Sequence, residues 1–139
     1  MINADKKKKI ESTTRLGFIG AGNMATAIIE GLLQAGVCER AQISVSHPSA
    51  AKGAKKFARL GIEDETDDNR HVAEACDVLI FCVKPQVLER VCERLRDLLD
   101  VKRHLVISIA AGLNLEKLTQ FLLGSSASLE SKATIPTNT

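Results

Sequence analysis

The residues that most clearly suggest chemistry form a glycine-rich turn near the start of the chain. Gly20, Gly22 and Ala25 have the spacing G-x-G-x-x-[GA] within the run Gly-Ala-Gly-Asn-Met-Ala. Gly20 would permit a tight turn, Gly22 would let a pyrophosphate approach the backbone, and Ala25 would let a helix pack closely on a strand. Phosphates would then lie at a helix N-terminus, where unpaired N–H groups and the helix dipole favour negative charge. The alternative is a strand-to-helix turn that binds no ligand.

The segments around this turn have the pattern that such a site requires. Residues 16–19 are typical of a strand, and residues 23–35 are typical of a helix that ends before Gly36. The apolar side of this helix is expected to consist of Met24, Ile28, Leu32 and Ala35.

Strands and helices are expected to alternate along the rest of the chain. Further strands are predicted at 43–46, within 62–68, at 78–83 and at 105–109. Helices are predicted at 49–60 with Ser49 as cap, at 69–76, from Pro85 to 99, and at 114–123 with Asn114 as cap. Residues 78–83 are apolar at every position, as a strand covered by helices on both faces requires. The alternation predicts an α/β fold with a doubly wound, mostly parallel sheet of the Rossmann type.

In such a sheet the ligand crevice lies at the carboxyl ends of the strands. The predicted topology therefore gathers four segments at one edge, namely 20–24, 46–49, 83–85 and 110–112.

The end of the second predicted strand bears on the choice of cofactor. An NAD site usually has an acidic residue there, which holds the ribose 2′-hydroxyl, but Ser44 to Ala51 contains none. Ser46, His47 and Ser49 instead offer hydroxyl and imidazole groups, and Lys52 follows one helical turn later. This pattern favours NADP(H) over NAD(H). Alternatively, the two serines are turn and cap residues, His47 is an exposed loop residue, and Lys52 is a solvated charge.

Composition limits the other classes of function. The 139 residues are 45% hydrophobic and 26% charged, which fits one globular domain. A net charge of +2 without Trp or Tyr gives no support for nucleic-acid binding. No apolar run is long enough for a membrane span, so no membrane association is expected.

The cysteines and the N-terminal segment carry no predicted site. The four cysteines form no C-x-x-C pair and have no His at metal-ligand spacing, so we expect buried thiols in a reducing compartment, no metal site, and a cytoplasmic location. Residues 1–14, with lysines at positions 6–9, are expected to form a disordered basic tail, with a basic localisation patch as the alternative, and residues 15–139 the dinucleotide-binding domain.

Three motifs resemble the pyrroline-5-carboxylate reductase family. They are Gly-Phe-Ile-Gly-Ala-Gly-Asn-Met-Ala-Thr-Ala-Ile at 17–28, Val-Lys-Pro-Gln at 83–86, and Ile-Ser-Ile-Ala-Ala-Gly at 107–112. The resemblance implies reduction of the imine of 1-pyrroline-5-carboxylate to L-proline with hydride from NAD(P)H, the last step of proline synthesis.

The resemblance also implies which residues hold the cofactor. The pyrophosphate would be held by Ile19, Gly20, Ala21, Gly22, Asn23 and Met24, and the adenosine ribose or its 2′-phosphate by Ser46 to Ser49. Asn69 would lie at the cofactor. The ribose and nicotinamide would lie near Val83, Lys84 and Pro85, and the nicotinamide ring beside Ala110, Ala111 and Gly112. Lys84 is equally well explained as an exposed lysine before a helix-starting proline. No residue is assigned as the general acid.

The resemblance weakens toward the C-terminus. The family continues into an R-x-M-P-N-T-P-like segment, of which only residues 137–139 match here. The helical domain that forms the family's dimer is expected to be missing, so we expect this chain to bind NADP(H) but to reduce the imine poorly, and to form homo-oligomers only with that domain. A non-catalytic NADP-binding module and a reductase of another small imine or oxo substrate are the alternatives.

Overall fold

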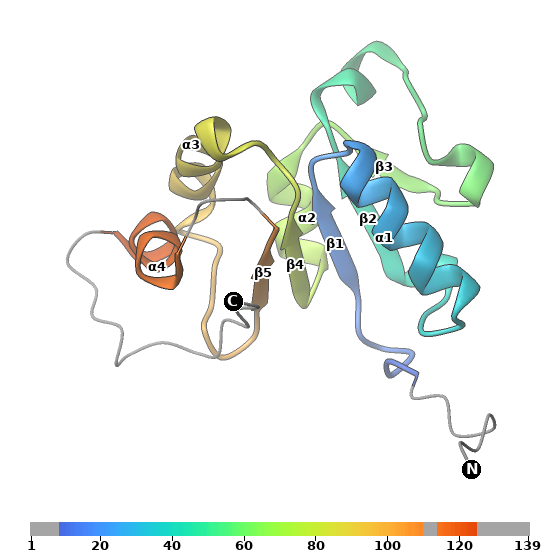
Figure 1. The fold of residues 1–139 in the computed structure, drawn as a ribbon, viewed down its shortest axis with the longest axis horizontal. Coiled ribbons are helices and arrows are strands. Elements are labelled where there is room, and N and C mark those ends of the chain that lie inside the picture. The colour runs from blue at the N-terminus through green and yellow to red at the C-terminus, as the bar shows by residue number, and fades with distance from the viewer. Residues whose placement is uncertain (1–8, 110–113, 125–139) are drawn as a thin grey trace.

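The computed structural model describes residues 9–109 and 114–124. Its centre is a five-stranded sheet in the order β3-β2-β1-β4-β5, in which every pairing is parallel (Figure 1). The strands are β1 (Leu16–Ile19), β2 (Ile43–Ser46), β3 (Asp64–Thr66), β4 (Val78–Phe81) and β5 (Leu105–Ser108). The α-helices are α1 (Asn23–Gln34), α2 (Asn69–Ala75), α3 (Pro85–Leu95) and α4 (Leu115–Leu123). The predicted doubly wound α/β fold is confirmed.

Helices cover both faces of the sheet, because alternate residues of each strand point to opposite sides. Leu16 and Phe18 of β1 belong to a buried cluster with residues of α1. Ile19 belongs to a second cluster, built with residues of α2, α3 and α4 on the other face. Both faces of the sheet centre are therefore apolar, which is why β4 is apolar at every position, whereas β2 alternates apolar and polar residues as Ile-Ser-Val-Ser.

The rotation of α1 about its axis differs from the prediction. Ala25 and Ile29 are fully buried against the sheet, whereas Met24 is 58% exposed. Each residue turns a helix by about 100°, so the buried side lies one residue later than the predicted stripe. Apolar residues on both flanks of α1 made the stripe ambiguous in the sequence, and contact with the sheet decides it.

The helix predicted at 49–60 is wrong. Two short 3₁₀ helices replace it, η3 (Pro48–Lys52) and η4 (Ala58–Leu60), and a third, η2 (Arg40–Gln42), precedes β2. Gly53 has φ +79° and ends η3 after Lys52. Ser49 lies inside η3, and His47 takes the cap position without a side-chain cap bond. By contrast, Asn114 caps α4 as predicted, because its side chain accepts a hydrogen bond from the Lys117 N–H at 2.8 Å.

Residues 10–14 are attached to the domain, in contrast to the disordered tail expected for 1–14. The Ile10 N–H donates to the Val37 carbonyl at 2.9 Å, and the Gln42 amide donates to the carbonyls of Glu11 and Thr14, both at 2.9 Å. Residues 1–8 and 125–139 lie outside the described part, so the lysines at 6–8 and the terminal motif stay predictions. No helix within residues 9–109 and 114–124 is long and apolar enough to cross a membrane.

Candidate functional site

The glycine turn lies at the carboxyl end of β1 and is held by both neighbouring strands. The Gly20 N–H donates to the Ser46 carbonyl at 2.8 Å, and the Ile19 carbonyl accepts from the Cys82 N–H at 2.8 Å. Gly20 has φ +104°, and a Cβ there would come within 2.9 Å of the Cys82 carbonyl carbon. A side chain is therefore excluded at Gly20 by both conformation and space, and its predicted role in the turn is confirmed.

Gly22 differs from Gly20, because a Cβ there would meet nothing within 4 Å. It is the N-cap residue of α1, with φ −77°, no side-chain cap bond and no acidic residue in the first turn that follows. The first N–H groups of a helix have no partner within the helix. This turn therefore presents uncapped backbone donors and open space, which together suit a phosphate group. Ala25 is fully buried, as its predicted close packing requires.

Two further predicted residues meet at the end of β2. The Ser46 hydroxyl donates to Oδ1 of Asn69, the first residue of α2, at 2.7 Å. Ser46 is fully buried, so its hydroxyl joins β2 to α2 instead of facing solvent. The structure thus brings Ser46 and Asn69 together beside the glycine turn, to which the Ser46 carbonyl is bonded.

His47 is not placed as either prediction had it. Its side chain is buried, and Nε2 lies 2.5 Å from Oε2 of Glu65. Nδ1 is buried without a hydrogen-bond partner among the described residues. The imidazole is therefore neither an exposed loop residue nor free to bind a phosphate. Ser49 is half-buried and Lys52 is exposed just beyond it, so these two remain the polar side chains available on η3.

Glu65 on β3 is the residue that the sequence analysis missed. Its carboxylate accepts hydrogen bonds from the backbone N–H groups of Lys56 at 2.7 Å and Phe57 at 3.1 Å, in addition to the contact with His47. Burial raises the pKa of Glu65, but the hydrogen bonds from His47, Phe57 and Lys56 outweigh it and leave the pKa below its usual value. The sequence offered no signal for this role, because Glu65 is one of five acidic residues between 63 and 68.

The lowered pKa predicts an acid-dependent loss of stability. The folded chain holds Glu65 ionised at pH values where the unfolded chain, with a pKa near 4.5, already binds a proton. The resulting stabilisation is present above that pH and is lost as pH falls through the lower folded pKa. We expect the free energy of unfolding to fall less steeply below pH 4.5 in Glu65→Gln than in the unchanged chain. Denaturant titrations across acidic pH measure this, and equal slopes would contradict it.

The end of β4 brings the next predicted segment to the same edge. Lys84 is the exposed N-cap residue of α3, and Pro85 is the first residue of that helix. A Cγ of Val83 would lie 3.0 Å from a Cβ at Gly20, so Val83 borders the glycine turn.

Burial raises the pKa of Cys82 to about 12, which keeps this thiol protonated and excludes it as a nucleophile at neutral pH. Ala110, Ala111 and Gly112 lie outside the described residues.

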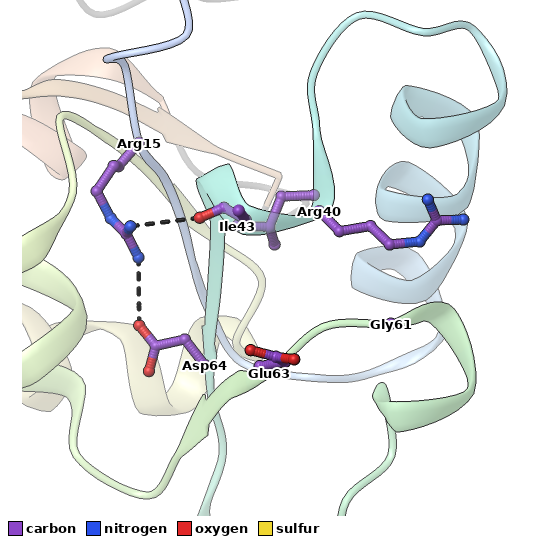
Figure 2. Close-up of a pocket in the computed structure, with 7 residues that line it drawn as sticks. Arg15, Arg40, Ile43, Gly61, Glu63 and Asp64 are labelled. Carbon is purple, nitrogen blue, oxygen red and sulfur yellow. Dashed lines mark hydrogen bonds and ion pairs between the residues drawn. The ribbon is translucent and has the colours of Figure 1, made fainter.

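A separate hollow of about 390 Å³ opens at the opposite, amino edge of the sheet (Figure 2). Arg15 points across it, donating to the Ala41 carbonyl at 3.3 Å and pairing with Asp64 at 3.4 Å. Glu63 also lines it, and Arg40 donates to the Leu60 carbonyl at 2.7 Å. We do not place a dinucleotide here, because both arginines that line the hollow are already bonded within the protein, and because none of its lining residues begins an α-helix. The helices that follow β1, β3 and β4 begin at the other edge.

Comparison with known proteins identifies the family. Residues 15–112 match the family model described as NADP oxidoreductase, coenzyme F420-dependent. The chain belongs to this family. Its resemblance to the pyrroline-5-carboxylate reductases is also confirmed. The chain is 38% identical over 108 residues to pyrroline-5-carboxylate reductase 3 of Rattus norvegicus, and this match covers 78% of the chain and 38% of the relative.

Solved structures of such reductases share the fold of this family member. The pyrroline-5-carboxylate reductase of Coxiella burnetii is 36% identical, with a TM-score of 0.71 over 79% of this chain and 40% of that one. The pyrroline carboxylate reductase of Plasmodium falciparum, solved with NADP bound, is 25% identical with a TM-score of 0.69 over 82% and 40%. The chain therefore spans about two fifths of the length of the relatives that it matches.

Proposed function

We propose that this chain is the cofactor-binding part of a pyrroline-5-carboxylate reductase that uses NADP(H). The observation that carries the proposal is the turn at Gly20 and Gly22. There, β1 runs into an uncapped helix N-terminus beside open space, in a chain whose relatives carry the name of this reductase. The open space at Gly22 fits a pyrophosphate, which a Cβ at that position would displace.

In this proposal the chain binds and orients the cofactor. The N–H groups that begin α1 bind the pyrophosphate, and η3 (Pro48–Lys52), with Ser49 and Lys52, faces the adenosine ribose and its 2′-phosphate. Val83, Lys84 and Pro85 line the crevice toward the nicotinamide end, and Asn69 holds Ser46 at the edge of the sheet. The reduced cofactor supplies a hydride to the imine carbon of 1-pyrroline-5-carboxylate, while the imine nitrogen takes a proton, which yields L-proline.

The preference for NADP(H) is supported by the residues after β2. No acidic residue lies between positions 44 and 51, so nothing in that run repels a 2′-phosphate. Lys52 is exposed, and the structure gives its ammonium no partner within residues 9–109 and 114–124. Ser49 precedes it on η3.

We also propose a cytoplasmic location, which the four free cysteines favour because thiols stay reduced in that compartment.

Calorimetric titration of the chain with NADPH and NADH tests the proposal. We expect saturable binding of both, with NADPH the tighter. Lys52→Gln should weaken NADPH binding about tenfold, because it removes a charged partner of the 2′-phosphate, and should leave NADH binding nearly unchanged. Lys102→Gln, an exposed lysine before β5, is the matched control. Equal affinities for the two cofactors would contradict the NADP(H) preference, and no binding of either would contradict the cofactor-binding role.

The second candidate is a non-catalytic NADP-binding module. Proline formation from 1-pyrroline-5-carboxylate, measured with NADPH and the purified chain, separates the two. Formation of proline would exclude the non-catalytic module, whereas activity on another small imine or oxo compound alone would favour a different reductase.

A further inference from the structure

One buried carboxylate holds both ends of the segment that follows β2. This segment, residues 47–57, begins at His47, passes through η3 and ends at Phe57. Glu65 contacts His47 Nε2 at the beginning of the segment and the N–H groups of Lys56 and Phe57 at its end. The two side chains in contact are buried, since the exposed fraction is 3% for the His47 side chain and 0% for that of Glu65.

The other contacts of segment 47–57 are local or lie at its two ends, where the His47 and Phe57 rings also pack with their centroids 6.5 Å apart. Its internal hydrogen bonds are short-range, from Ala50 to His47, from Gly53 to Ala50 and from Ala54 to Ser49. At its beginning the His47 N–H bonds the Thr66 carbonyl of β3 at 2.9 Å, and at its end Phe57 is buried in the cluster beneath α1. Between these two anchors, residues 48–56 pack no side chain into either core cluster. The conformation of η3 therefore depends on how its two ends are held.

The charge of Glu65 is compensated where it lies. Three donors reach its two carboxylate oxygens, and the Lys55 ammonium donates to its backbone carbonyl at 2.8 Å. A buried carboxylate with this many donors is costly to replace, because each donor would be left without a partner.

We propose that Glu65 is a positioning residue for recognition of the cofactor's 2′-phosphate. By clamping His47 and the 56–57 backbone, it keeps η3 in the shape that presents Ser49 and Lys52 at the carboxyl edge. This inference rests on the proposed function. Without the contacts of Glu65, segment 47–57 would become ordered only when a ligand binds to it. The entropy lost in that ordering would weaken the binding of any ligand that contacts the segment. NADPH contacts it through the 2′-phosphate, and NADH lacks that group.

The test compares Glu65→Ala and Glu65→Gln with the unchanged chain by two measurements. Hydrogen exchange of the Lys56 and Phe57 amides reports the clamp without any nucleotide, and calorimetry reports the dissociation constants of NADPH and NADH. We expect faster exchange at both amides in Glu65→Ala. We expect its NADPH dissociation constant to rise about tenfold, against less than about threefold for NADH. Glu65→Gln should lie between, because the amide oxygen still accepts from the backbone.

Glu63→Ala and Glu63→Gln are matched controls, since Glu63 is exposed two residues earlier and its carboxylate lines the opposite edge. These control variants should leave the ratio of the NADPH and NADH dissociation constants unchanged. Unchanged exchange at Lys56 and Phe57 in Glu65→Ala would overturn the clamp. Faster exchange together with an equal loss of affinity for NADPH and NADH, or with no loss of affinity for either, would overturn the positioning role and leave the proposed function standing. Absence of nucleotide binding by the unchanged chain would instead overturn the proposed function, and the inference with it, before any variant is compared.

Discussion

Replacing Gly22 by alanine is expected to weaken the binding of both NADPH and NADH at least about tenfold while the chain stays folded. Nothing in the protein lies within 4 Å of the added Cβ, and φ −77° suits an alanine, so the free chain accommodates the change. The bound pyrophosphate does not, because the methyl group fills the space through which it reaches the helix N–H groups. Both cofactors lose affinity, since both carry the pyrophosphate.

Gly31→Ala is the matched control for Gly22→Ala. It adds the same methyl group to the same helix, also with nothing within 4 Å, but away from the carboxyl edge. We expect unchanged cofactor binding and a gain in stability of about 0.5–1 kcal/mol, because alanine is more stable than glycine in the interior of a helix. Calorimetry and thermal unfolding of the two variants measure these effects. Binding by Gly22→Ala as tight as that of Gly31→Ala would show that no phosphate approaches this turn.

Replacing Gly20 by alanine is expected to destabilise the fold by about 3 kcal/mol and to lower the melting temperature by about 10 °C. Two costs combine at this position. A side chain is strained at φ +104°, and its Cβ would meet the Cys82 backbone at 2.9 Å, where the neighbour is backbone that cannot rotate away. Differential scanning calorimetry measures the change without any cofactor.

Gly36→Ala separates the two costs of the Gly20 change. Gly36 also has a positive φ, +69°, but nothing lies within 4 Å of an added Cβ. It should therefore lose about 1 kcal/mol from backbone strain alone. If Gly20→Ala were no more destabilising than Gly36→Ala, the close approach of β4 to the glycine turn would be refuted.

The two glycines of the turn thus have different physical tasks, although they look alike in the sequence. Gly20 is required by the protein itself, because the backbone of Cys82, the residue that follows β4, lies directly beside it. Gly22 is not required by any contact within the described residues, which is equally true of Gly31 and Gly36, so its role as a phosphate-binding position rests on its place at the N-terminus of α1 and stays a proposal. The spacing predicted the turn at Gly20, which its φ of +104° confirms, because it belongs to a local strand-turn-helix unit; the predicted approach of a pyrophosphate at Gly22 stays a prediction.

The end of β2 shows where prediction from sequence failed. Three polar residues were expected to face a phosphate there, yet Ser46 is bonded to Asn69 and His47 to Glu65. Their partners lie 23 and 18 residues away along the chain, on α2 and β3. Hydrogen-bonding side chains can pair with each other as readily as with a ligand, and only the fold brings the pairs together.

The sequence by itself determined the features that depend on neighbouring residues. These include the glycine turn, the apolar strand β4, the cap at Asn114 and the end of α1 before Gly36, where local conformation and local hydrogen bonds decide the outcome. Gly53, which ends η3, was also a local signal, although the predicted helix at 49–60 ran through it. The tertiary structure alone decided which side of α1 is buried and where Glu65 acts. Those outcomes depend on packing and pairing between distant segments, which local propensity does not encode.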